Sequence, residues 1–262
     1  MPRRRRAAEA GWLAPRTIVL FLGSLLAFSA VAWGLGRLYA PAPVVDLTPQ
    51  AARVPGLPPT SAARSTEVSR SDADGRSTAV DPAWLRTTAA KAGIPIPALR
   101  AYADAQVSDA GGCQVGWTTL AGIGWVESHH GTIGGRTLGD DGVPSPPIIG
   151  PALDGTHGFA AIRSTPESQA WHGDATWEHA VGPMQFLRSS FDRWATDGDG
   201  DGVANPQDID DAAATTARYL CASGQDLSTG SGWAAAIFSY NHSQAYVDDV
   251  YAAATAYAQR TG

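Results

Sequence analysis

The sequence predicts a mainly α-helical domain over residues 81–262, and three observations lead to this prediction. Apolar residues recur at helical spacing in several segments, whereas no stretch shows the sustained alternation of a strand. Aromatic residues are absent from residues 41–80 and frequent after them. A length of about 180 residues suits one domain with one hydrophobic core.

Seven helices are expected along this domain. Asp81 followed by Pro82 predicts a helix start, because the carboxylate can accept backbone N–H bonds and proline suits the first turn. The helical patterns cover residues 83–93, 97–107, 117–130, 187–195, 209–222, 232–239 and 243–259. Residues 131–180 are rich in Gly, Pro, Asp and Thr, and a loop of this length is expected to be functional or disordered. Its aromatic residues Phe159, Trp171 and Trp177 favour order.

The N-terminal part predicts export. Arg3 to Arg6 form a cationic block, and residues 17–36 carry no charge over a length that suits a membrane span. We expect residues 1–40 to form an uncleaved anchor with a cytoplasmic Arg-rich end, and a signal cleaved after the pattern at 30–32 is the alternative. Residues 41–80 contain six prolines and predict a disordered linker. The folded domain is therefore expected outside the cytoplasm, tethered to the membrane, or secreted if the signal is cleaved.

The net charge and the cysteine content exclude some classes of function. The net charge is −6, and because residues 1–40 hold six Arg and one Glu, the remainder is near −11. This argues against nucleic acid as a partner. Cys113 and Cys221 are an even pair in the exported part, where oxidising conditions favour a disulfide over a free catalytic thiol.

Glu127 is the first candidate catalytic residue. It ends an apolar, helix-like segment that Gly131 can terminate, and at helical spacing it shares a face with Leu120, Ile123 and Gly124. A carboxyl group that points inward there has a raised pKa and suits a general acid. The alternative is that Glu127 leans into solvent, and this segment alone does not decide between the two.

Two further motifs follow. Residues 180–190 contain a Gly-Pro-x-Gln-Phe turn that places Gln185 just before a helix, and Tyr240-Asn241 end a later helix. Together with the Glu-Ser pair at 127–128, these motifs resemble lytic murein transglycosylases, most closely the type B, membrane-bound lineage with a lysozyme-like fold. The resemblance covers about residues 81–262.

The resemblance implies roles for these residues. Glu127 would be the sole catalytic acid and base, and Gln185, Tyr240 and Asn241 would bind substrate. Thr176, nine residues before Gln185, takes the place of a serine hydroxyl in the family. The implied reaction cleaves the β-1,4 bond between N-acetylmuramic acid and N-acetylglucosamine in peptidoglycan and forms a 1,6-anhydromuramoyl product. Cell-wall synthesis or division machinery is the expected class of protein partner.

Two other functions remain as alternatives. A hydrolytic muramidase would need a second carboxylate, for which Asp174 and Glu178 are the candidates, although we expect both to cap the loop or to face solvent. A calcium-stabilised wall-binding module without activity is the other alternative.

Alternating acids before Gly202 resemble an EF-hand loop and predict a structural calcium ion. The longer loop of the type B enzymes makes Asp211 the better closing ligand. Without calcium, the same acids would form an Asp-Gly turn that favours the N-terminus of the next helix. The expected ligands are Asp197, Asp199, Asp201, the carbonyl of Val203, and Asp211, with Asp208 as the alternative closing ligand.

Histidines and tryptophans are common near these motifs. No His-Glu-x-x-His helix is present, and adjacent histidines on a helix diverge, so we expect the histidines at 129, 130, 157, 172 and 179 to be loop or surface residues rather than zinc ligands. No organic cofactor is expected. Of the tryptophans at 117, 125, 171, 177, 194 and 233, most are expected in the core and one or two against sugar.

Overall fold

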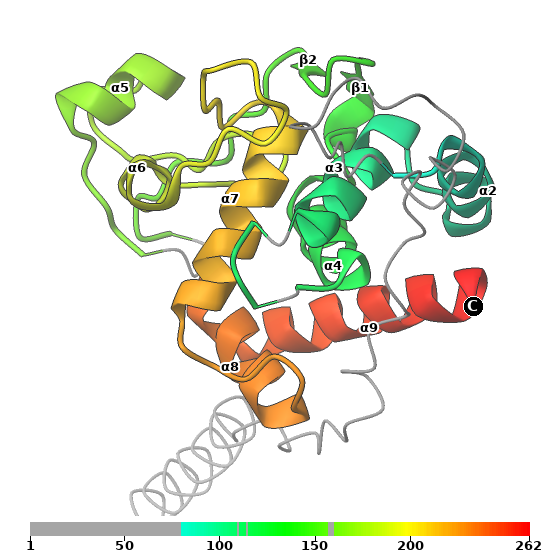
Figure 1. Ribbon diagram of the computed structural model, residues 1–262. Coiled ribbons are helices and arrows are strands. Elements are labelled where there is room, and N and C mark those ends of the chain that lie inside the picture. Colours follow the sequence, from blue (N-terminus) through cyan, green and yellow to red (C-terminus); the bar gives the residue numbers. More distant parts are fainter. Residues whose placement is uncertain (1–79, 109, 114, 157–159) are drawn as a thin grey trace, which may run out of the picture. The chain divides into compact units, whose positions relative to one another are not determined.

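The computed structural model describes residues 80–108, 110–113, 115–156 and 160–262 (Figure 1). These residues all belong to one compact unit of the chain. The expected anchor, nearly all of the expected linker, and His157 and Phe159 lie outside the described residues. Within the described part of the chain, no helix has both the length and the apolar character to cross a membrane.

The described part of the chain is mainly helical, as predicted. Two short antiparallel strands, β1 (Thr137–Leu138) and β2 (Pro144–Ser145), pair Thr137 with Ser145 and Leu138 with Pro144. A 3-10 helix, η2 (Ile133–Gly135), precedes them. The α-helices are α2 (Pro82–Ala92), α3 (Ile96–Val107), α4 (Trp117–Ser128), α5 (Pro166–His172), α6 (Arg188–Trp194), α7 (Ile209–Ala222), α8 (Gly230–Tyr240) and α9 (Gln244–Thr261).

Local signals set the ends of several helices. The Asp81 carboxylate accepts from the backbone N–H of Ala83 (2.7 Å) and of Trp84 (3.0 Å) and so caps α2. Gly93 ends the same helix with a φ of 72°, a left-handed conformation that glycine adopts without strain. This first helix therefore begins and ends where the sequence predicts.

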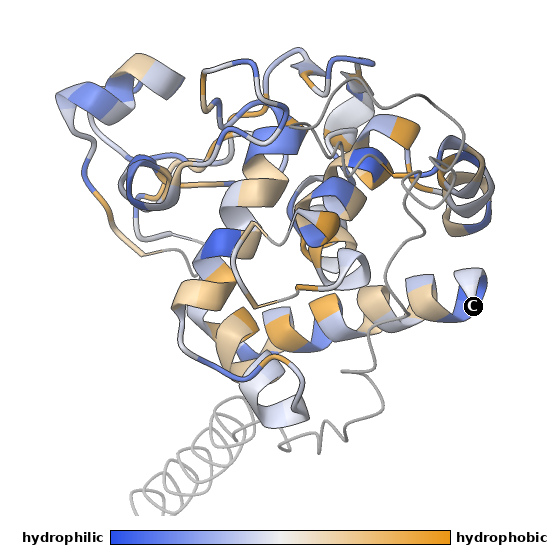
Figure 2. Ribbon diagram, viewed as in Figure 1, coloured by the Kyte–Doolittle hydropathy of each residue, from blue (hydrophilic) through white to orange (hydrophobic). Residues whose placement is uncertain are grey.

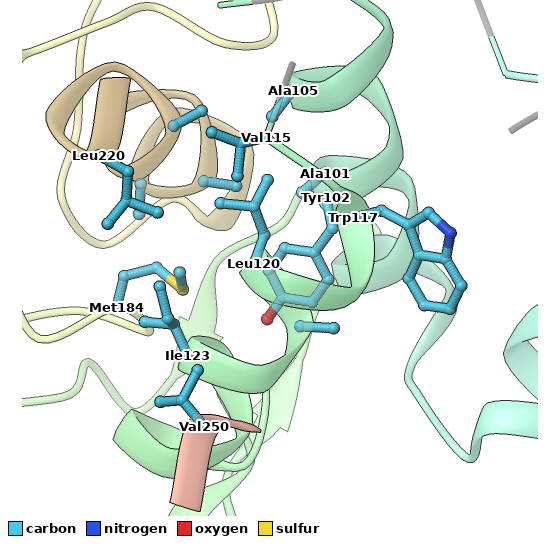
Figure 3. Packing of buried hydrophobic residues seen from close by; sticks show 14 of the residues in the cluster. Ala101, Tyr102, Ala105, Val115, Trp117, Leu120, Ile123, Met184, Leu220 and Val250 are labelled. Carbon is cyan, nitrogen blue, oxygen red and sulfur yellow. The ribbon is translucent and has the colours of Figure 1, made fainter. Parts of the chain in front are cut away.

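Helix α4 lies in the centre of the core. Leu120 and Ile123 are fully buried between α3, α7 and α9, and Figure 3 shows both beside Met184. Glycine allows the close approach of the neighbouring helices, because a Cβ at Gly122 would lie 2.8 Å from the Val250 carbonyl oxygen of α9. Helix α9 carries both apolar and polar residues (Figure 2), and its buried residues recur three to four positions apart, as expected for a helix with one buried face: Tyr246, Val247, Val250, Ala254 and Tyr257.

A disulfide joins Cys113, which lies between α3 and α4, to Cys221 near the end of α7. The two cysteines are 108 residues apart in sequence. The predicted disulfide is therefore present, and it joins the connection between α3 and α4 to α7.

The end of α4 differs from the prediction. The helix stops at Ser128, and both His129 (φ 51°) and His130 (φ 60°) adopt left-handed conformations. His130 is buried between the hydroxyl groups of Tyr102 (3.1 Å from Nδ1) and Tyr257 (2.8 Å from Nε2). Burial lowers the pKa of His130 to about 3. His130 is therefore a loop residue, which is one of the two expected positions, but it does not lie at the surface, because distant tyrosines enclose it.

The segment at 131–180 carries more structure than predicted. It contains the β1–β2 hairpin and the helix α5, which begins at a capping box formed by Thr165 and Ser168. Isolated bridges pair Asp154 with Ala161 and Arg163 with Trp177. In the described residues this segment is therefore an ordered layer that holds itself together by backbone pairing.

Candidate functional site

Glu127 lies in the last turn of α4 and is half-buried. Its Oε1 accepts a hydrogen bond from the hydroxyl of Tyr246 in α9, at 2.6 Å. Burial raises the pKa of Glu127 to about 7, and the hydrogen bond from Tyr246 opposes this rise because it favours the carboxylate. A carboxyl group with such a pKa can donate a proton and accept one near neutral pH.

The three sequence motifs meet at the turn formed by residues 182–186. The hydroxyl of Ser128, next to Glu127, donates to the Pro183 carbonyl oxygen at 2.6 Å. The hydroxyl of Tyr240, at the end of α8, donates to the Met184 carbonyl oxygen at 2.7 Å. The ends of α4 and α8 are therefore both fixed to the turn that carries Gln185.

The turn itself is tightly built. Val181 and Phe186 exchange two backbone hydrogen bonds of 2.9 Å, and Gln185 has a φ of 50°. The Gln185 side-chain amide donates to the Gly182 carbonyl oxygen at 2.9 Å. Gly182 has a φ of 78°, and a Cβ there would overlap the Pro206 carbonyl oxygen. The Gly of the Gly-Pro-x-Gln-Phe motif is thus required by both conformation and space.

Tyr246 is a site residue that sequence reasoning missed. Its ring stacks on that of Tyr240, with centroids 6.4 Å apart and planes 10° apart, and Tyr240 packs edge-on against Phe186. Burial, together with the charge of Glu127, raises the pKa of Tyr246 far above its usual range, so that its hydroxyl remains a donor. The signal was present in the sequence, because a tyrosine on the apolar face of α9 needs a hydrogen-bond partner.

Thr176 and Asn241 are exposed. The backbone N–H of Thr176 donates to Asp174 Oδ1 at 2.7 Å, and that of Asn241 donates to the Ile237 carbonyl oxygen at 3.3 Å. Each residue is thus held through its backbone. Their side chains are accessible to a ligand.

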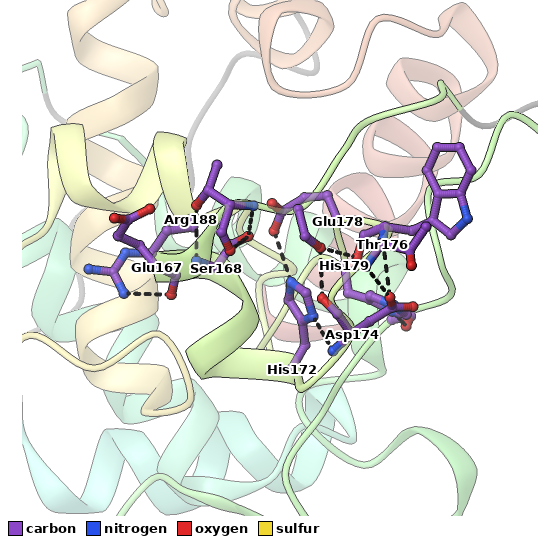
Figure 4. A network of polar contacts seen from close by, with 12 residues as sticks. Glu167, Ser168, His172, Asp174, Thr176, Glu178, His179 and Arg188 are labelled. Carbon is purple, nitrogen blue, oxygen red and sulfur yellow. Dashed lines mark hydrogen bonds and ion pairs between the residues drawn. The ribbon is translucent and has the colours of Figure 1, made fainter.

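The two candidates for a second acid have contacts of their own. Asp174 accepts from the backbone N–H groups of Thr176 and Trp177 and contacts His179, and these interactions lower its pKa to about 2. Glu178 is only 5% exposed, and its Oε1 lies 3.4 Å from Nε2 of His172 (Figure 4). The expected capping role is therefore observed for Asp174. The surface position expected for Glu178 and His172 was wrong, because their side chains are 7% and 0% exposed and lie against each other.

The tryptophans divide between the core and the surface. Trp117 and Trp233 are buried, and the Trp233 indole N–H donates to the Thr119 hydroxyl at 3.0 Å. Trp125 is 44% exposed and stacks on His129, with ring centroids 4.3 Å apart. The other three, at 171, 177 and 194, are half-buried.

The acidic loop between α6 and α7 brings three carboxylates together. Oxygen atoms of Asp197, Asp199 and Asp211 lie within 4.8 Å of one another. Asp201 instead accepts from the backbone N–H of Val203 at 2.7 Å, and Asp208 accepts from the backbone N–H of Asp210 at 2.9 Å and caps α7. Of the two candidate closing ligands, Asp211 is thus the one that joins the group.

The electrostatics of this loop agree with a cation-binding role. Burial raises the pKa of Asp208 to about 6, and the charges of neighbouring acids, Asp211 among them, add to the rise. Burial also raises the pKa of Asp211, with further contributions from Asp199 and Asp197. A divalent cation would relieve this repulsion, and the oxygen donors are those that calcium prefers.

Residues 161–237 match the protein family described as Transglycosylase SLT domain. The matched part includes Thr176, Gln185 and the acidic loop, whereas Glu127 precedes it and Tyr240 and Tyr246 follow it. The match supports an enzyme of the transglycosylase kind. No curated protein matches the chain.

Similar solved structures include the Escherichia coli lytic transglycosylase Slt35 in complex with bulgecin A, which is 18% identical in sequence with a TM-score of 0.41. The similarity covers 69% of this chain and 75% of that one. Slt35 in complex with calcium is also similar, with the same identity and TM-score and with coverage of 69% and 76%.

Proposed function

We propose that this chain is a lytic transglycosylase that cleaves the β-1,4 bond between N-acetylmuramic acid and N-acetylglucosamine in peptidoglycan. The observation that carries the proposal is the state of Glu127. A single carboxyl group with a pKa of about 7 and a short hydrogen bond from Tyr246 can serve as acid in one step and as base in the next. The match of residues 161–237 to the transglycosylase SLT domain supports the same substrate class.

The reaction has two proton transfers. Protonated Glu127 gives its proton to the glycosidic oxygen, the bond from this oxygen to the muramoyl C1 breaks, and the leaving sugar departs as an alcohol. The Glu127 carboxylate then takes the proton of the muramoyl C6 hydroxyl while that oxygen bonds to C1. The product is a 1,6-anhydro ring, Glu127 is protonated again, and no water is consumed. The tethered hydroxyl has a high effective concentration, which favours it over water.

The contacts of the other acids favour this route over hydrolysis. Asp174 is engaged by two backbone N–H groups and His179, and Glu178 is buried against His172. Burial and Tyr246 account for the pKa of Glu127, without a contribution from either acid. A second carboxylate that activates water is therefore not needed to explain the site.

Four residues are proposed to hold the glycan. Gln185 lies in the turn to which Ser128 and Tyr240 are hydrogen-bonded, and Thr176 and Asn241 present accessible polar side chains. An amide, a hydroxyl and a phenol suit the hydroxyl and N-acetyl groups of the sugar. Hydrogen bonds to the N-acetyl oxygen would stabilise the cationic centre that develops at C1.

A structural calcium ion is part of the proposal. Asp197, Asp199 and Asp211 would hold it, with the Val203 carbonyl and Asp201 as the remaining EF-hand positions. The ion would fix the loop between α6 and α7 and leave the chemistry to Glu127.

We also propose that the enzyme acts outside the cytoplasm, held to the membrane by residues 1–40, and that cell-wall synthesis or division machinery directs it. The disulfide between Cys113 and Cys221 supports an oxidising compartment. Sequencing the N-terminus of the exported protein distinguishes a retained anchor from a signal cleaved near residue 32.

Digestion of purified peptidoglycan, followed by mass spectrometry of the soluble products, tests the function. The expected products end in anhydromuramic acid and disappear with Glu127→Gln. The matched control is Glu167→Gln, the same change at an exposed acid of α5, which should leave the products unchanged. Products with reducing ends would make the enzyme a hydrolytic muramidase. Binding to cell walls without soluble fragments, unaffected by Glu127→Gln, would make it a wall-binding module.

A further inference from the structure

His179 connects two segments that carry proposed glycan contacts. Its Nε2 lies 3.2 Å from Asp174 Oδ2, and the other carboxylate oxygen of Asp174 holds the backbone N–H of Thr176. Its Nδ1 lies 2.7 Å from the carbonyl oxygen of Gly150. A single ring therefore links the turn that carries Thr176 to Gly150, and Figure 4 shows His179 beside Asp174 and Thr176.

The Gly150 segment in turn lies against the Gln185 turn. The backbone N–H of Gly150 donates to the Ala180 carbonyl oxygen at 2.8 Å. The side-chain oxygen of Gln185 is so close to Gly150 that a Cβ there would lie 2.5 Å from it. A displacement of Gly150 would thus move the side-chain amide of Gln185.

The two partners of His179 determine where its protons lie. A backbone carbonyl oxygen accepts and does not donate. Asp174, whose pKa is lowered to about 2, is ionised and also only accepts. Both ring nitrogens of His179 must therefore carry a proton for the two hydrogen bonds to form together, which makes the ring an imidazolium.

His172, whose ring lies beside that of His179, carries a proton on only one of its two ring nitrogens. Nδ1 of His172 accepts from the backbone N–H of Asp174 at 3.2 Å, so its proton is on Nε2, which faces Glu178. The rings of His172 and His179 are 4.8 Å apart, and a neutral His172 avoids a second positive charge. Asp174, His172 and, behind it, Glu178 are the titratable groups that face His179 in the described residues.

We propose that His179 is a positioning residue whose imidazolium form clamps the Thr176 turn to the Gly150 and Gln185 segment and so sets the geometry of glycan binding. This inference rests on the proposed function. Without the ring, both acceptors lose their donor. The Thr176 turn is then no longer tied to Gly150, and substrate binding weakens while Glu127 is untouched.

The variant Asp174→Asn can keep both hydrogen bonds of the clamp with an uncharged His179 ring. In Asp174→Asn the amide oxygen can still accept from the Thr176 backbone, and the amide nitrogen can donate to Nε2 of a neutral His179. That ring would keep its proton on Nδ1 for Gly150. The variant therefore preserves both hydrogen bonds of the ring without its positive charge.

The test measures kcat and KM for soluble glycan strands across pH. His179→Ala should raise KM about tenfold and change kcat less than about twofold. In Asp174→Asn, which keeps both hydrogen bonds, KM should stay within about twofold of the parent's, and kcat should keep the pH profile set by Glu127. A His179→Ala variant with the parent's KM, or an Asp174→Asn variant whose KM rises as much as that of His179→Ala, overturns the proposal.

A second measurement needs no substrate. Proton NMR of the full-length protein at mildly acidic pH should show slowly exchanging signals for both ring N–H groups of His179, because both are hydrogen-bonded. Rapid exchange of either proton overturns the clamp, even if the enzyme is active. Conversely, two protected ring protons together with an absence of glycan cleavage would leave the clamp intact and refute the proposed function.

Discussion

Replacement of Tyr246 by phenylalanine removes one oxygen atom from the site and tests which contacts set the pKa of Glu127. The lost hydroxyl donates to Glu127 at 2.6 Å, a short distance typical of a charge-assisted hydrogen bond. Because this bond stabilises the carboxylate, its loss raises the pKa of Glu127 beyond about 7. The expected change is therefore opposite to that of a loss of burial.

The size of the change follows from the strength of the bond. A hydrogen bond to a charged group contributes about 1.5–3 kcal/mol, and one pKa unit corresponds to 1.36 kcal/mol. Glu127 is half-buried, so water can replace part of the lost interaction. We expect the pKa of Glu127 to rise by about one unit in Tyr246→Phe.

The assay is the pH dependence of anhydromuramoyl product formation. The alkaline limb reports the ionisation of the general acid and should move upward by about one pH unit in Tyr246→Phe. Tyr219→Phe is the matched control, because its hydroxyl donates to the Ser239 carbonyl oxygen at 2.5 Å. An alkaline limb that stays in place or moves downward in Tyr246→Phe would refute this account of the site.

Three further predictions concern stability. Folding raises the pKa of Glu127 from 4.5 to about 7, so the ionisation of Glu127 opposes folding as pH rises through this range. Between about pH 4.5 and pH 8, the free energy of unfolding of Glu127→Gln, measured in urea, should therefore rise by about 2 kcal/mol relative to that of the parent. An equal difference between the two proteins at both pH values would contradict this. Calcium should raise the Tm of the parent and a chelator should reverse the effect, whereas Asp211→Asn should respond to neither. Gly182→Ala should lower the free energy of unfolding by more than about 3 kcal/mol, because its Cβ overlaps the Pro206 carbonyl. Gly173→Ala, also at positive φ but in open space, should lower it by about 1 kcal/mol. Similar losses for the two variants in thermal unfolding would disprove the steric argument.

Features with a local cause could be predicted from the sequence. The Asp81–Pro82 start and the Gly93 end of α2 depend on residues within one turn, and the structure has them where the pattern puts them. The mainly helical fold and the disulfide also follow from pattern and pairing alone. The position of Glu127 at a helix end belongs to the same class, because helical spacing alone indicates it.

Features that depend on distant segments could not be predicted. His130 is buried because Tyr102, 28 residues before it, and Tyr257, 127 residues after it, enclose its ring. Tyr246 reaches Glu127 across 119 residues of sequence. Glu178 is buried against His172, the last residue of α5, a helix of 7 residues that is too short for a clear periodic signal. In each case the partner is supplied by tertiary packing.

The bond between Cys113 and Cys221 also determines what a single proteolytic cut can do to this domain. The long segment at 131–180 lies inside the covalent ring that the bond closes, so a cut there does not separate the two parts of the domain. Glu127 and Gln185 would then be on different polypeptides, yet the two pieces would stay joined. Nicked protein should therefore migrate as one species without reductant and as two with it.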